Sequence, residues 1–204
     1  MSGPPQITLQ HVPFSRSLRV RWLLEELGLP YELATRSFAE LRRPEHLALH
    51  PLGKVPVLRD GDVVLFESGA ILQYLLERYG GGRLEPQPGS PERALYWQWF
   101  HYAEASVTPP LGLIVRHTAL LPEAERLPAL VESARTEAKR VLAPVERALA
   151  GKSWLVGDLS AADIMMGYSL KLVSLLRLLG EATPNLAAYL ARCEERPAYQ
   201  RAVQ

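Results

Sequence analysis

Residues that could bind a small charged peptide are concentrated in residues 53–68. Two apolar, strand-like runs flank an Asp-Gly turn there, which predicts a β-hairpin. Pro56 is at the start of the first run. Proline there has no backbone N–H to donate to a neighbouring strand, and the Val55-Pro56 peptide bond could be cis. Glu67 and Ser68 follow the second run at the predicted start of a helix, where free N–H groups attract an anion. The pattern predicts a site that binds the amine of a ligand at the acidic side chain and a carboxylate of the ligand at the helix N-terminus.

The composition is that of an ordinary globular protein. The chain has 204 residues, of which 48% are hydrophobic and 22% charged, enough for one large domain or two small ones. Its net charge of +1 and the absence of long Lys/Arg runs argue against nucleic-acid and membrane partners. No basic region followed by an apolar stretch opens the chain, so a cytoplasmic location is expected. Cys193 is the only cysteine, and the histidines lack metal-type spacing, so no metal is expected.

Short strand and helix patterns alternate over residues 1–80. Residues 7–10 and 31–34 predict strands on either side of a helix, and the hairpin adds two more strands before a helix over residues 68–79. The predicted order is βαβ-α-ββ-α, which is typical of a small α/β sandwich.

Breaker residues fill residues 81–90, which are predicted to be an interdomain linker. Strand patterns stop there, so residues 91–204 are predicted to form an all-α domain. The helices expected in it cover residues 91–106, 127–150, 160–179, 185–194 and 197–203. Ser160 and Asp163 have the spacing of a capping box at the start of one of these helices.

Several sequence runs, taken in order, resemble the cytosolic glutathione transferases. They are Ser15–Val20, Glu25–Glu32, Lys54-Val55-Pro56 with Glu67-Ser68, Gly157–Asp163, and Pro184–Leu186 with Arg196–Ala198. The first run is similar to the serine-type bacterial and fungal branch and has some zeta-like features. The resemblance covers nearly the whole chain and implies a thioredoxin-like N-terminal domain, glutathione as co-substrate, a homodimer and a role in detoxification.

Glutathione carries two carboxylates, one ammonium group and one thiol, and the resemblance assigns residues to its polar groups. Val55, beside Pro56, would pair its backbone with the cysteinyl unit. Glu67 and Ser68 would hold the γ-glutamyl ammonium and carboxylate respectively. Lys54 would meet the glycyl carboxylate. Taken singly, each residue is better explained as an edge proline, a helix cap or a solvated charge; the set together favours binding.

The thiol is expected at the N-terminus of the first helix, where Ser15, Arg16 and Ser17 cluster and the helix dipole favours an anion. By resemblance, Ser15 is the first choice for the hydroxyl that donates to the thiolate. Ser17 is the alternative, and Arg16 would supply positive charge. Each serine alone is equally well explained as a helix cap. Alignment with zeta-class enzymes puts Phe14 where their principal serine stands.

The electrophile is expected to bind an apolar wall. Phe14 and residues of the helix after the linker are the candidates for it, namely His101, Tyr102 and Thr108. Many side chains of that helix must instead be core. Glu104 resembles the acidic residue that, in this family, reaches glutathione in the partner subunit, although an exposed helical glutamate needs no such role.

Three functions follow from these expectations. The first is a homodimeric glutathione transferase that conjugates the thiolate to a small hydrophobic electrophile. The second is a glutathione-dependent isomerase of the maleylacetoacetate type, which would need cationic groups such as Arg16 or Arg116 in the second site. The third is a noncatalytic glutathione-binding or ligand-binding relative, an interpretation that Phe14 at a serine position supports.

Overall fold

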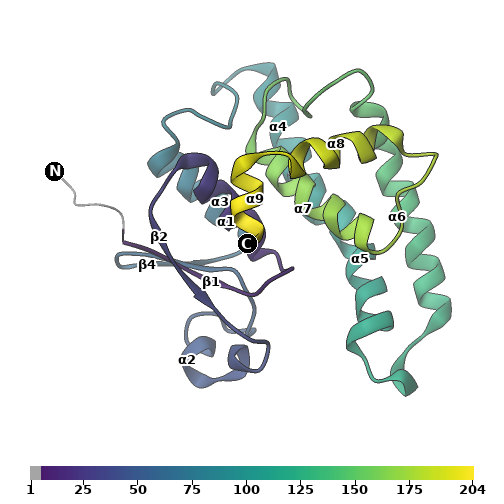
Figure 1. Ribbon diagram of the computed structural model, residues 1–204, viewed down its shortest axis with the longest axis horizontal. Coiled ribbons are helices and arrows are strands. Elements are labelled where there is room, and N and C mark those ends of the chain that lie inside the picture. Colours follow the sequence, from purple (N-terminus) through teal and green to yellow (C-terminus); the bar gives the residue numbers. More distant parts are fainter. Residues whose placement is uncertain (1–5) are drawn as a thin grey trace. The chain divides into compact units, whose positions relative to one another are not determined.

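The structure is a computed structural model that describes residues 6–204, and it divides into two compact units. One unit is Glu85–Cys193. The other contains the chain up to Leu84 together with Glu194–Gln204. Figure 1 shows the strands in the first part of the chain and only helices after it.

A four-stranded mixed sheet forms the centre of the N-terminal unit, in the order β2-β1-β3-β4. The strands are β1 (Ile7–His11), β2 (Tyr31–Thr35), β3 (Val57–Asp60) and β4 (Val63–Phe66). β1 and β2 are parallel because a helix connects them, whereas β1 with β3 and β3 with β4 are antiparallel. The predicted order of strands and helices along the chain and the predicted hairpin are confirmed.

The helices of this unit cover both faces of the sheet. Figure 1 shows α1 (Ser17–Leu27) and α3 (Ser68–Leu75) on one side and α2 (Pro44–Leu47) on the other. A 3-10 turn at Glu40–Arg42 precedes α2, and a π-helical turn at Leu76–Gly80 extends α3. This arrangement confirms the thioredoxin-like fold expected for the N-terminal part.

The second unit is all-α, as predicted. Its helical segments are α4 (Pro91–Tyr102), η3 (Ala103–Val107), α5 (Thr108–Val115), η4 (Arg116–Leu120), η5 (Glu123–Glu125), α6 (Pro128–Ala148), α7 (Ala161–Leu175) and α8 (Pro184–Glu194). The helices expected from the sequence did not include α5. Pro109 and Pro110 lie in its first turn, where proline costs little. Within the described residues, no helix combines the length and apolar character needed to cross a membrane.

The predicted capping box at the start of α7 is confirmed, with Ser160 at the N-cap and Asp163 at N3. Asp163 is fully buried and accepts hydrogen bonds from the backbone N–H and the hydroxyl of Ser160, both at 2.8 Å. It also accepts from the Leu155 N–H at 3.0 Å and the Tyr189 hydroxyl at 2.8 Å. Burial raises the pKa of Asp163, and these hydrogen bonds oppose the rise. One carboxylate therefore ties a helix start to a loop and to α8.

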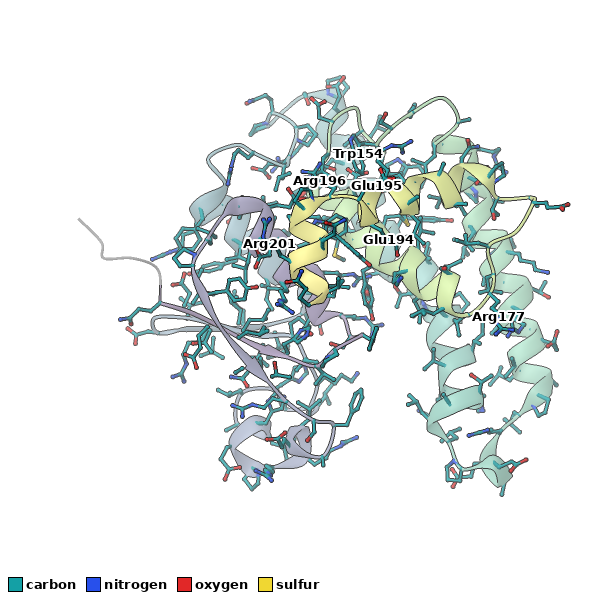
Figure 2. All side chains as sticks on the ribbon, viewed as in Figure 1. Trp154, Arg177, Glu194, Glu195, Arg196 and Arg201 are labelled. Carbon is teal, nitrogen blue, oxygen red and sulfur yellow. The ribbon has the colours of Figure 1, made fainter. Side chains whose placement is uncertain are left out.

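The C-terminal helix α9 (Pro197–Val203) belongs to the N-terminal unit, whereas the sequence pattern alone grouped it with the other helices. Arg196 forms a two-point ion pair with Glu26 of α1, at 2.5 and 2.8 Å. Arg201 pairs with Glu25 at 2.7 Å. Figure 2 labels both arginines on this segment. The grouping depends on these long-range contacts, which no local pattern encodes.

Candidate functional site

The loop before β3 carries the first group of candidate residues. The Val55-Pro56 bond is cis, as the position of the proline suggested. Pro56 is buried, Val55 is half-buried and Lys54 is exposed. The Lys54 carbonyl accepts a hydrogen bond from Nε2 of buried His46 at 2.8 Å, which fixes the path of the loop. The exposed Lys54 side chain therefore extends from a loop whose backbone is fixed by the hydrogen bond from His46.

Gly53 and His50 complete this loop. Gly53 has φ 57°, and a Cβ there would lie 2.6 Å from the Leu41 carbonyl oxygen, so only glycine fits. The His50 carbonyl accepts a hydrogen bond from the Gly53 N–H at 2.8 Å. The ring Nδ1 of His50 accepts a second hydrogen bond, from the Leu52 N–H at 3.2 Å. The sequence pattern assigned His46 and His50 no role, but both residues shape this loop. Within residues 6–204, no group of three or more metal-ligating side chains comes together.

Glu67 stands at the junction of β4 and α3 in a strained backbone conformation, with φ 74° and ψ 111°. A non-glycine residue in a strained backbone conformation costs on the order of 1 to 3 kcal/mol, and such residues cluster at active sites and ligand-binding sites. The side chain is exposed, and no hydrogen bond or ion pair engages its carboxylate among the described residues. The conformation thus presents an unpaired carboxylate at the start of a helix.

Ser68 is buried beside it as the first residue of α3. Its hydroxyl accepts a hydrogen bond at 3.2 Å from Nη1 of Arg19, a fully buried residue of α1. Arg19 was not among the site residues expected from the sequence. A signal was present, since Arg19 precedes Leu23 by one helical turn and so lies on the buried face. A guanidinium placed there adds positive charge to a helix N-terminus that already favours anions.

Ser15 and Ser17 come together immediately before α1, with their Oγ atoms 2.7 Å apart. Ser15 is half-buried and donates to the Val12 carbonyl at 2.7 Å. Ser17 is fully buried, and its Oγ lies 2.8 Å from Nδ1 of His11. The structure therefore connects Ser15, through Ser17, to a histidine at the end of β1 that the sequence analysis did not connect with the serines.

Phe14 and Arg16 precede and follow Ser15 in the chain, and both are exposed. Phe14 has φ 60° and leaves 81% of its surface open to solvent, which is unusual for so large an apolar side chain. Arg16 occupies the N-cap position of α1 but makes no side-chain cap. Ser15 is therefore bordered by one apolar and one cationic side chain.

His11 predicts a measurable pH dependence of stability. Burial and the nearby charge of Arg21 lower the pKa of His11 from 6.5 to about 4. Between pH 6.5 and about 4, the unfolded chain binds a proton that the folded chain does not. Stability therefore falls with acidification across this window, by up to about 1.4 kcal/mol per pH unit.

Urea unfolding at both ends of that window measures this dependence in the wild type and in His11→Asn. The free energy of unfolding of the wild type should fall more steeply toward low pH, because the variant lacks the titrating ring. Equal pH slopes for the two proteins would contradict the assignment.

The candidates of the helical unit lie along α4 and η3. His101 is exposed and stacks on Trp97, with ring centroids 5.7 Å apart. Tyr102 is half-buried and donates its hydroxyl to the Val141 carbonyl at 2.9 Å. Glu104 is half-buried in the π-helical segment η3. Their environments differ, and only His101 presents an exposed ring.

Thr108 lies in the interior of the helical unit, where its hydroxyl donates to the Ala103 carbonyl at 2.7 Å. Tyr102 instead borders a cavity of about 570 Å³ between α5 and α6, together with Pro109 and Leu113. A cavity of that volume lies in the range of small-molecule sites. Glu137 and Arg140 also line this cavity, so Tyr102 borders a cavity of mixed apolar and charged character.

The fold and the proline loop together define a thioredoxin-like protein with an appended helical unit. The sequence matches the family profile of the glutathione S-transferase N-terminal domain over residues 5–77 and that of the C-terminal domain over residues 109–197. The chain belongs to the glutathione S-transferase family.

Individual relatives support this membership. Glutathione S-transferase 4 of Zea mays is 37% identical over 89% of this chain and 84% of its own length. Glutathione S-transferase GstB of Escherichia coli is 32% identical, with 91% of each chain covered. The glutathione transferase URE2P8 of Phanerochaete chrysosporium, solved with oxidised glutathione, has a TM-score of 0.86 at 29% identity, over 99% of this chain and 95% of that one. A family member from Pseudomonas fluorescens, solved with two glutathione molecules, has a TM-score of 0.88 at 28% identity, over 100% and 94%.

Proposed function

We propose that this protein is a glutathione transferase that binds glutathione at the loop before β3 and the start of α3, and conjugates its thiolate to a hydrophobic electrophile. The observation that carries the proposal is Glu67, whose strained backbone presents an unpaired carboxylate next to buried Ser68. Backbone strain is retained where function requires it. Solved relatives that hold glutathione support the choice of ligand.

Each polar group of glutathione has a proposed partner in this unit. The γ-glutamyl ammonium pairs with Glu67, and its carboxylate binds at Ser68, where Arg19 and the helix dipole add positive charge. The cysteinyl backbone pairs with the extended backbone at Val55. The glycyl carboxylate meets Lys54, which is exposed on a held loop. The tripeptide therefore lies with its thiol toward the N-terminus of α1.

Ser15 is the proposed donor to the thiolate. A thiol with a pKa of about 8.5 is roughly 3% ionised at neutral pH, and lowering the pKa by about 2 units ionises roughly 75%. A thiolate of lower pKa is also a weaker nucleophile. With a Brønsted slope of about 0.4 to 0.5, this lowers its reactivity about 6- to 10-fold and offsets much of the gain in thiolate population. The net activation is only a few-fold, so most of the acceleration must come from holding the electrophile against the sulfur.

The second substrate is proposed to be small and apolar, in keeping with the exposed ring of Phe14 and with His101 and Tyr102 on the helical unit. Thr108 is proposed only as packing support, because its hydroxyl is buried and engaged. Detoxification in the cytoplasm is the physiological role that such chemistry would serve.

A homodimer is proposed because β4 is an edge strand with apolar residues left exposed. Val63, Val64 and Phe66 are all exposed there, and Leu52 is exposed in the preceding loop. An uncovered apolar edge favours association, and a second copy of the chain would cover it. Glu104 would then be the residue that approaches the partner's glutathione.

Steady-state conjugation of glutathione to an activated aryl halide tests the proposal. The wild type should form the thioether well above the uncatalysed rate, and Ser15→Ala should lower kcat by about threefold or more. Turnover of a maleyl diacid without conjugation would favour the isomerase. Tight glutathione binding without either reaction would favour a noncatalytic role.

A further inference from the structure

We propose that His11 is a positioning residue: its Nδ1–H donates to Ser17, and this sets the direction of the Ser17–Ser15 hydrogen bond so that the Ser15 hydroxyl is free to donate to the glutathione sulfur. The inference rests on the proposed function and deepens it. It assigns a role to a buried histidine that neither binds metal nor contacts the substrate.

The three side chains form an unbroken line of short contacts. His11 Nδ1 lies 2.8 Å from Ser17 Oγ, and Ser17 Oγ lies 2.7 Å from Ser15 Oγ. Ser15 Oγ lies 2.7 Å from the Val12 carbonyl oxygen. The histidine is held by β1, which pairs in parallel with β2, and by the Arg36 N–H donating to its carbonyl at 2.7 Å. The line therefore starts at a fixed strand and ends at the proposed thiol site.

Counting hydrogens fixes the direction of this line. A carbonyl oxygen only accepts, so Ser15 must donate its single hydroxyl proton to Val12 in the 2.7 Å contact. The 2.7 Å contact between the serines then requires Ser17 to donate to Ser15. Ser17 has no second proton, so the contact with His11 requires Nδ1–H as the donor.

Ser17 Oγ also lies 3.3 Å from the Val12 carbonyl oxygen, but its single proton is used in the shorter 2.7 Å contact with Ser15. The backbone N–H contacts agree with that direction. The Val12 N–H donates to Ser17 Oγ at 3.3 Å, and the Ser17 N–H donates to Ser15 Oγ at 3.3 Å. Each serine oxygen then accepts two hydrogen bonds and donates one, which uses its full capacity. No group in the line is left unsatisfied.

The opposite direction disables Ser15. If His11 carried its proton on Nε2, Nδ1 would accept the Ser17 proton. If Ser15 then donated its proton to Ser17, no proton would remain for the sulfur. If Ser15 donated elsewhere, the two serine oxygens would lie 2.7 Å apart with no hydrogen between them, which is unfavourable. The tautomer of His11 therefore decides whether the Ser15 proton is available.

Only a neutral imidazole has two tautomers, and the surroundings of His11 keep its ring neutral. Burial and the charge of Arg21 hold the pKa of His11 at about 4, so the ring carries one proton at neutral pH. When glutathione binds, the thiol proton leaves to bulk water, and the Ser15 hydroxyl turns away from the Val12 carbonyl to donate to the sulfur. The Val12 carbonyl keeps the hydrogen bond from the Ser15 backbone N–H at 3.3 Å. Ser17 continues to donate to Ser15, which strengthens the Ser15 hydrogen bond without any proton transfer along the line.

The first experiment reads the tautomer directly. Nitrogen-15 NMR of the imidazole in the wild type, with His11→Asn used to assign its resonances, should show the proton on Nδ1 at neutral pH. A proton on Nε2 would overturn the inference, whatever the activity of the protein.

The second experiment measures the pKa of the thiol of bound glutathione by ultraviolet titration, in the wild type, His11→Leu and His11→Asn. His11→Leu should raise that pKa by about 0.5 to 1 unit, a roughly three- to tenfold loss of thiolate stabilisation. His11→Asn should restore most of it, because its amide can donate from nearly the position of Nδ1. Affinity for S-methylglutathione, which has no thiol to ionise, should stay within about twofold in both variants. Gln10→Leu is the matched control, since Gln10 precedes His11 on β1 and instead accepts from Arg36 at 2.8 Å.

The outcomes separate this inference from the proposed function. If the wild type does not lower the pKa of the bound thiol, the proposed function fails. If the wild type lowers it and Ser15→Ala abolishes the effect, while His11→Leu leaves it unchanged, only the role of His11 fails.

Discussion

Replacing Asp163 with alanine is expected to reduce the free energy of unfolding by about 3 to 5 kcal/mol. The carboxylate accepts hydrogen bonds from Leu155, Tyr189 and both donors of Ser160, and all four donors would lose their partner in a fully buried site. Each unsatisfied buried donor costs on the order of 1 to 3 kcal/mol, but relaxation and water entry make the sum smaller than four separate losses. Urea unfolding followed by far-ultraviolet circular dichroism measures the change.

Asp158→Ala is the matched control for this substitution. Asp158 is five residues earlier in the chain and is exposed, so its loss should change the free energy of unfolding by less than about 0.5 kcal/mol. A cost below about 1 kcal/mol for Asp163→Ala would contradict the central position given to that carboxylate in the helical unit.

Glu67→Gln is expected to weaken glutathione binding by roughly 10- to 100-fold while leaving the fold intact. Glutamine keeps the size of the side chain and the backbone strain of the site, and removes only the charge that we propose to pair with the γ-glutamyl ammonium. A hydrogen bond to a charged group contributes about 1.5 to 3 kcal/mol, which gives this range. Stability should be unchanged, because no described residue pairs with the carboxylate. Isothermal titration calorimetry with glutathione measures the effect.

Asp62→Asn serves as the control for a general effect of charge. Asp62 is exposed in the turn of the same hairpin, at the end of β4 remote from Glu67. Its replacement should leave the Kd for glutathione within about twofold. Equal losses in the two variants would show that Glu67 acts through the overall field of the protein and does not contact the ligand.

Local patterns in the sequence were sufficient for much of the fold. The Asp-Gly turn between two apolar runs predicted the β3-β4 hairpin, and the spacing of Ser160 and Asp163 predicted the start of α7. Lys54, Val55, Glu67 and Ser68, four of the residues proposed to bind glutathione, also lie within a single stretch of chain. Features of this kind are set by residues a few positions apart, which is why a sequence pattern reveals them.

Contacts between distant residues could not be predicted in the same way. Arg19 meets Ser68 only because α1 packs beside α3, and α9 joins the N-terminal unit through Arg196 and Glu26. His11 precedes Ser17 by only six residues, yet their contact depends on how the chain turns between β1 and α1. The residue types of His11, Arg19 and Glu26 do not reveal such partners, because the partners are brought near only by the fold.

The central claim is that this protein binds glutathione as a thiolate that Ser15 stabilises, and the ultraviolet difference spectrum of bound glutathione at neutral pH tests it most directly. The wild type should show a strong thiolate signal, with most of the bound thiol ionised compared with roughly 3% of free glutathione. Ser15→Ala should lose that signal while still binding S-methylglutathione. Saturating binding of glutathione by the wild type with no thiolate signal would contradict the account, and loss of the signal only in Ser17→Ala would move the donor from Ser15 to Ser17.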